Sequence, residues 1–91
     1  MQKTTVWKFT LNVADETTLR IPEGSELLLV GTQAGNIALW FRVNPEARVE
    51  EVTYQVRGTG HDCRRCGRHL GSVLLHGGAL VFHVFTTAVG E

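Results

Sequence analysis

Apolar and polar residues alternate with a period of two along most of this chain, which is typical of strands with one buried face. The alternation is clear near the start, where Trp7, Phe9 and Leu11 share a face. The continuous apolar run at 27–31 predicts a strand that is buried on both faces. No segment has the spacing of an amphipathic helix. The pattern predicts strands at residues 6–11, 17–21, 27–31, 37–43, 49–57, 70–75 and 79–85.

Turn residues separate these predicted strands. Residues 22–25 read Pro-Glu-Gly-Ser, in which Gly24 is free to take a positive φ. Residues 34–36, Ala-Gly-Asn, predict a hairpin, and His-Gly-Gly at 76–78 predicts a second one. Asn44 followed by Pro45 is suited to cap one short helical turn. We expect that turn to end quickly, because the period of two resumes at residue 49.

These elements predict a mostly β fold. It is an antiparallel sandwich or a partly open barrel of about six or seven strands, with at most one short helical turn. The 91 residues suffice for a single domain spanning 1–91. Several predicted strands are apolar on both faces, and a chain of this size has little with which to cover the second face. We therefore expect a homodimer.

Charge and targeting signals narrow the partners and the location. Nine basic and nine acidic side chains cancel, which argues against direct binding to nucleic acid or to acidic membranes. The longest apolar stretch, residues 70–85, is interrupted by glycine and histidine and is not expected to span a membrane. The N-terminal residues lack the apolar core of a signal peptide. We therefore expect a cytoplasmic protein whose two cysteines are thiols in a reducing compartment.

Both cysteines and all four histidines lie within residues 58–85. His61, Cys63, Cys66 and His69 form the pattern H-x-C-x2-C-x2-H, and a pair of cysteines at this spacing is half of a common zinc site. The second, distant pair of ligands is missing, and nine consecutive residues wrap poorly around one tetrahedral ion. The favoured interpretation is therefore a flexible loop with exposed thiols, and a zinc site is the alternative. No other cofactor is predicted.

The same loop is strongly basic. Arg64, Arg65 and Arg68 crowd it, and in a protein without net charge such a group favours a protein-docking patch over a nucleic-acid interface. We predict that these arginines bind the partner together with His61 and with Trp40.

Signals for catalysis are weak. A catalytic dithiol is disfavoured because the cysteine pair lies between strands and not at the start of a helix. His83, between apolar neighbours, is interpreted as a core or interface histidine with a satisfied ring. Paired carboxylates in a recognisable frame and a Ser/His/Asp order are absent from the sequence. The sequence therefore predicts a protein that is not an enzyme.

Motifs along nearly the whole chain resemble a family of small bacteriophage and prophage proteins of unassigned function. They are V-W-K-F-T-L, I-P-E-G-S-E-L-L-L-V-G-T-Q-A-G, A-L-W, V-N-P-E-A, R-G-T-G-H and L-G-S-V-L-L-H-G-G-A-L-V-F-H-V-F, in this order. The resemblance implies that residues 62–69 are a variable loop added to the fold. Small phage proteins of this kind are often counter-defence factors, including anti-CRISPR proteins that block a Cas protein surface.

Three hypotheses of function follow. The leading one is a phage-encoded inhibitor of a bacterial defence system, acting by protein–protein binding and blocking a Cas effector in the cytoplasm of an infected or lysogenic host. The first alternative is a protein that sequesters a host signalling nucleotide with arginines and aromatic side chains. The second alternative is a zinc-stabilised nucleic-acid-binding module that uses the loop directly.

Overall fold

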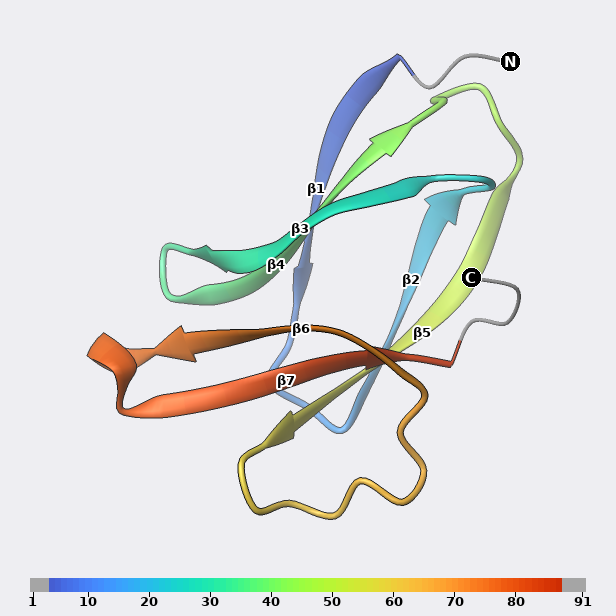
Figure 1. Ribbon diagram of the computed structural model, residues 1–91. Helices are drawn as coiled ribbons and strands as arrows, with labels where there is room; N and C mark the ends of the chain where they lie inside the picture. The colour runs from blue at the N-terminus through green and yellow to red at the C-terminus, as the bar shows by residue number, and fades with distance from the viewer. Residues whose placement is uncertain (1–3, 88–91) are drawn as a thin grey trace.

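A computed structural model describes residues 4–87, and they fold into a two-layer β sandwich (Figure 1). One antiparallel sheet has the strand order β1-β4-β3, and the other has the order β2-β5-β7-β6. The prediction of a mostly β, antiparallel sandwich is confirmed, and the described strands do not close into a barrel. The strands are β1 (Thr5–Leu11), β2 (Glu16–Pro22), β3 (Glu26–Gln33), β4 (Asn36–Val43), β5 (Val49–Gly58), β6 (Arg68–Leu75) and β7 (Leu80–Thr86).

The core lies between the two sheets and contains every second residue of the central strands. A ring contact between Phe41 of β4 and Tyr54 of β5, with 6.5 Å between centroids, joins the layers. Burying each large aliphatic side chain contributes about 1.5–3 kcal/mol, so this alternation is the main source of stability. The buried apolar side chains include Leu11, Ile21, Ile37, Leu39, Phe41, Val43, Tyr54, Val56, Val73, Leu75 and Val84.

The predicted turns form with the expected backbone. Gly24 has φ +78°, and Gly35 follows Ala34 in the left-handed region at the β3–β4 hairpin. Asn44 caps a simple turn, in which its Oδ1 accepts from the N–H of Glu46 at 3.1 Å, and the expected helical turn does not form there. The helical turn of the described chain is the 3-10 turn His76–Gly78 between β6 and β7. Residues 4–87 include no helix with the length and apolar character needed to cross a membrane.

The prediction that residues 27–31 are buried on both faces is wrong. These residues belong to β3, which is an edge strand with β4 as its hydrogen-bonded neighbour. A bulge between Leu27 and Leu29 shifts the register, and Leu28 and Leu29 remain 45% and 54% exposed. Every strand of a two-layer sandwich has one face that no other layer covers, so the second set of apolar side chains of β3 meets solvent. Beside it runs β6, where a Cβ on Gly71 would lie 3.0 Å from Val30.

Candidate functional site

Residues 59–67, here called the cysteine loop, connect β5 to β6 and lie over the outer face of the four-stranded sheet. Gln55 and Arg57 show this, because they alternate along β5 with the buried core residues Tyr54 and Val56 and so point outward. Both outward side chains nevertheless hydrogen-bond to the loop backbone. Gln55 is only 1% exposed, which means that the loop covers it.

Gln55 uses both ends of its amide to hold the second half of the loop. Its Nε2 donates to the carbonyl of Arg65 at 2.7 Å, and its Oε1 accepts from the N–H of Gly67 at 2.7 Å. A buried amide that is satisfied in this way specifies one loop position, because leaving it unpaired costs about 1–3 kcal/mol. At Gly67 a Cβ would lie 1.9 Å from the carbonyl oxygen of Thr86, so only glycine fits against the end of β7.

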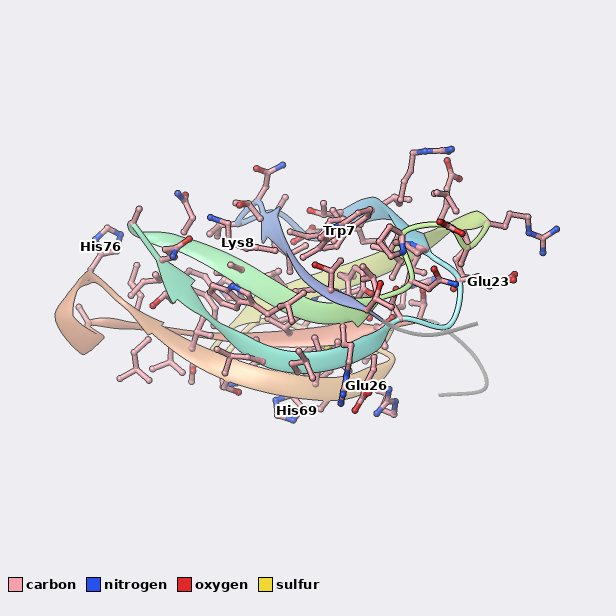
Figure 2. All side chains as sticks on the ribbon, turned by 90° about the horizontal axis from the view of Figure 1, so that it is seen from above. Trp7, Lys8, Glu23, Glu26, His69 and His76 are labelled. Atoms are coloured by element: carbon pink, nitrogen blue, oxygen red, sulfur yellow. A yellow bond between two sulfur atoms is a disulfide. The ribbon has the colours of Figure 1, made fainter. Side chains whose placement is uncertain are left out.

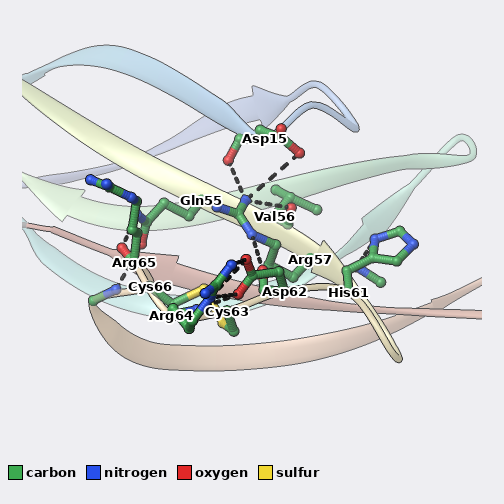
Figure 3. The surroundings of a disulfide bond; sticks show 12 residues. Asp15, Gln55, Val56, Arg57, His61, Asp62, Cys63, Arg64, Arg65 and Cys66 are labelled. Atoms are coloured by element: carbon green, nitrogen blue, oxygen red, sulfur yellow. Dashed lines mark hydrogen bonds and ion pairs between the residues drawn. A yellow bond between two sulfur atoms is a disulfide. The ribbon is translucent and has the colours of Figure 1, made fainter.

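Arg57 holds the first half of the loop (Figure 3). Its Nε donates to the carbonyl of Asp62 at 2.9 Å, and its Nη1 donates to the carbonyl of Asp15 at 2.7 Å and to that of Val56 at 3.1 Å. The Arg57 side chain is only 14% exposed. It therefore ties the loop to the turn between β1 and β2 through the carbonyls of Asp62 and Asp15.

Cys63 and Cys66 are joined by a disulfide across a tight turn. The N–H of Cys66 donates to the carbonyl of Cys63 at 3.1 Å, and the Cα atoms are 5.0 Å apart, a separation that permits this bond. The structure thus differs from the expectation of free thiols on a flexible loop. Neither the turn nor the two side-chain clamps is encoded within the C-x2-C pattern itself, so the pattern could not indicate them.

The arginines of the loop have unequal roles. Arg64 is paired with Asp62, whose two carboxylate oxygens accept from its Nε and Nη2 at 2.8–3.1 Å. This pairing lowers the pKa of the Asp62 carboxyl and raises the pKa of Arg64. The guanidinium of Arg65 makes no hydrogen bond or ion pair within residues 4–87. Among the described residues of the loop, Arg65 is therefore an exposed positive charge without a carboxylate beside it.

The four residues of the zinc hypothesis do not meet. Both sulfurs are consumed in the disulfide, and Nδ1 of His61 accepts from the N–H of Gly58 at 3.2 Å. His69 lies on β6, near the end opposite His76 at the hairpin tip (Figure 2). Across residues 4–87, no group of three or more His, Cys, Asp or Glu side chains is placed to hold a metal ion. The residues of the loop therefore do not fit a zinc ion in this structure.

Three of the five predicted contact residues, His61, Arg64 and Arg65, lie together on the cysteine loop. Arg68 begins β6 and instead lines a cleft between the sheets, beside Phe41 and Tyr54. This cleft has a volume of about 80 Å³.

Trp40 lies apart from the loop. It is on β4 of the other sheet, opposite Lys8 and Leu29 in the strand register. Trp40 and the arginine loop therefore belong to different layers of the sandwich, and the role of Trp40 in binding stays a prediction.

A polar chain beside the loop was not predicted. Oγ of Ser72 lies 2.8 Å from Nδ1 of His83 and 3.1 Å from Nε2 of His69, and Nε2 of His83 lies 3.0 Å from Oγ1 of Thr59. Both ring nitrogens of His83 are thus satisfied, but the residue is half-buried on the outer face and not in the core. The predicted hairpin turn at 76–78 could have indicated this contact, because the register of that hairpin pairs Ser72 with His83.

An open apolar hollow of about 370 Å³ adjoins the start of the cysteine loop. One wall is the turn at 58–61, and the other is formed by Leu80, Val81 and Phe82 of β7. Leu80 is 44% exposed. The outer face of the four-stranded sheet therefore carries a positive charge and a polar chain, whereas Leu80 and Phe82 of the hollow share a face of β7 with the buried Val84.

Comparison with curated proteins gave no significant match, and comparison with solved structures gave none either. A family model, by contrast, matches residues 1–91, the full length of the chain. The chain therefore belongs to the family described as Domain of unknown function (DUF7352).

Proposed function

We propose that this protein acts by binding another protein through its cysteine loop and has no catalytic activity of its own. The observation that carries this proposal is the presentation of Arg65 on a backbone that Gln55 and Arg57 hold in place. A loop ordered before binding loses less conformational entropy when a partner docks, which strengthens the complex. An arginine that has no carboxylate of its own is available to pair with one on the partner.

The chemistry of this surface defines the partner. An acidic side chain would pair with Arg65, and an apolar or aromatic side chain would enter the hollow beside Leu80. The Ser72–His83 chain lies between β6 and β7 and supplies hydrogen-bonding groups to the outer face of the sheet. The partner we propose is therefore a protein that offers a carboxylate and an exposed apolar anchor.

The finer proposal is that the partner is a component of a bacterial defence system. It is supported by the resemblance to phage and prophage proteins, and by the small size and neutral charge that suit a steric inhibitor. Within that class we propose a CRISPR–Cas effector as the target, met in the cytoplasm of an infected or lysogenic host. The homodimer also stays a prediction, and the exposed Leu28 and Leu29 of the edge strand are the residues to test it with.

A pull-down with purified Cas effector complexes tests the proposal directly. We expect the wild-type protein to retain a Cas subunit and Arg65→Glu to lose it at least tenfold, since the substitution places a carboxylate opposite a carboxylate. Arg42→Glu is the matched control, because Arg42 lies on the opposite sheet in a pair with Glu26. Equal retention by the two variants would refute the loop as the contact surface, and failure of the wild-type protein to bind would refute the Cas target.

Sequestration of a signalling nucleotide is the second candidate, and one observation bears on it. The cleft beside Arg68 combines a guanidinium with the rings of Phe41 and Tyr54, which are groups that bind a phosphate and a base. Its volume of about 80 Å³ is, however, well below the roughly 300–1,000 Å³ of ordinary ligand sites. Thermal unfolding in the presence of cyclic nucleotides tests this candidate, which requires a ligand-dependent rise in Tm that Arg68→Gln abolishes.

A further inference from the structure

The Cys63–Cys66 disulfide closes a ring within a segment that other contacts already hold. Gln55 and Arg57 bind the loop backbone on either side of the cysteine pair. A disulfide between residues only three apart removes little entropy from the unfolded chain, so it stabilises a fold less than a long-range bridge does. The disulfide therefore contributes little to the stability of the loop, and we consider its chemical reactivity instead.

We propose that Cys63 and Cys66 form a reversible dithiol–disulfide couple that exchanges with an external dithiol. The two sulfurs differ in access, since Cys63 is exposed and Cys66 is half-buried. Thiol–disulfide exchange depends on access to the attacked sulfur and on stabilisation of the departing thiolate. Attack at Cys63 meets the first condition.

The exchange proceeds in two steps. A thiolate of the external dithiol attacks Sγ of Cys63, the Sγ–Sγ bond breaks, and Cys66 leaves as a thiolate that takes up a proton. The second thiol of the reagent then loses its proton and attacks the reagent's first sulfur, which is bonded to Sγ of Cys63. This step releases Cys63 as a thiolate, which takes up a proton. The protein gains two electrons and two protons as Cys63 and Cys66 become thiols, and the reagent loses both as it becomes a cyclic disulfide.

The clamps determine how readily the couple closes again. They bind backbone atoms and not sulfur, so they remain after reduction and keep the two Cα atoms near their 5.0 Å separation. Groups held together in this way react at a high effective concentration, which favours the intramolecular disulfide over a mixed one. Removing the Gln55 clamp should therefore make the dithiol form more stable relative to the disulfide.

The test is equilibration of the full chain in buffers of reduced and oxidised dithiothreitol, with alkylation of free thiols and counting of the added groups by mass spectrometry. We expect a fully reversible two-electron transition, without a persistent mixed disulfide. In Gln55→Leu the equilibrium should shift about tenfold towards the dithiol, which corresponds to about 30 mV. The matched control is Gln33→Leu, on the exposed β3–β4 hairpin, and it should retain the wild-type equilibrium.

Circular dichroism of each variant shows whether it folds, and Arg57→Gln removes the clamp on the other side if Gln55→Leu does not fold. A wild-type disulfide that fails to reduce, or that fails to close again in the folded protein, would overturn the proposal. A folded clamp variant with the wild-type equilibrium constant would overturn it as well.

Discussion

The two outer faces of this sandwich are built in different ways. On the three-stranded sheet, Trp40 lies between Lys8 and Leu29, and strand register alone brings the three together. On the four-stranded sheet, the cysteine loop lies over β5 and is held there by Gln55 and Arg57. The first face follows from alternation along the strands, whereas the second depends on two side chains of β5 that hydrogen-bond to the backbone of the loop that follows this strand.

This difference indicates which of the two faces has its backbone fixed by side-chain hydrogen bonds. On a face made by strand register alone, the exposed side chains are the alternate residues of each strand, and no further contact selects them. A face covered by a clamped loop presents a defined backbone with Arg65 on it, and its construction uses buried polar groups that must all be satisfied. Four predictions compare the two faces, from the largest expected effect to the smallest.

Replacing one glycine by alanine on each face should give the largest difference in the free energy of unfolding. Gly67→Ala places a Cβ 1.9 Å from the carbonyl oxygen of Thr86, a backbone atom that cannot move alone, and should lower the free energy of unfolding by about 4 kcal/mol. Gly31→Ala places its Cβ 3.4 Å from the ring of Trp40 and should cost about 1 kcal/mol or less. Urea unfolding of both variants measures the difference, and equal losses would contradict the close packing of the loop.

Replacing the buried amide tests the clamp itself. Gln55→Leu leaves the carbonyl of Arg65 and the N–H of Gly67 without their partner, and should lower the free energy of unfolding by about 3 kcal/mol. In Gln33→Leu an exposed contact with Lys8 is lost, for which we expect about 0.5 kcal/mol. Chemical denaturation followed by tryptophan fluorescence compares the two, and a small effect at Gln55 would show that the loop does not depend on it.

Removing the disulfide should have a smaller effect. The double variant Cys63→Ser, Cys66→Ser should lose about 1 kcal/mol, because the bridge spans a short segment and the clamps remain. The measurement is thermal unfolding of the variant beside the oxidised wild-type protein. A loss as large as that of Gln55→Leu would mean that the sulfur bridge and not the amide holds the loop.

The smallest effect concerns pH. Pairing with Arg64 lowers the pKa of Asp62 below its ordinary 3.8, so the pair stabilises the loop above that pH, and this stabilisation is lost as pH falls through the lower folded-state value. NMR titration of the Asp62 carboxyl should show the lowered pKa in the wild-type protein. In Arg64→Ala it should return towards 3.8. An unchanged pKa in that variant would remove Arg64 as the cause.

Much of the architecture could be read from the sequence. The alternation of Ile37, Leu39, Phe41 and Val43 places them in the core, because a strand puts alternate side chains on opposite faces. The hairpin turns were equally readable, since Gly35 occupies a backbone conformation that few residues adopt. The exposure of residues 27–31 was not readable, because it depends on the number of layers in the fold and on the bulge between Leu27 and Leu29.

The sequence by itself therefore determined the strands, their turns and the inward face of the strands that alternate, all of which follow from local spacing and local backbone preference. Only the tertiary structure decided the site. It separated Trp40 from the loop, joined Cys63 to Cys66, and bound the loop to Gln55 and Arg57. These contacts depend on the order of strands in two sheets and on the path of a loop over one of them, and no local pattern encodes either.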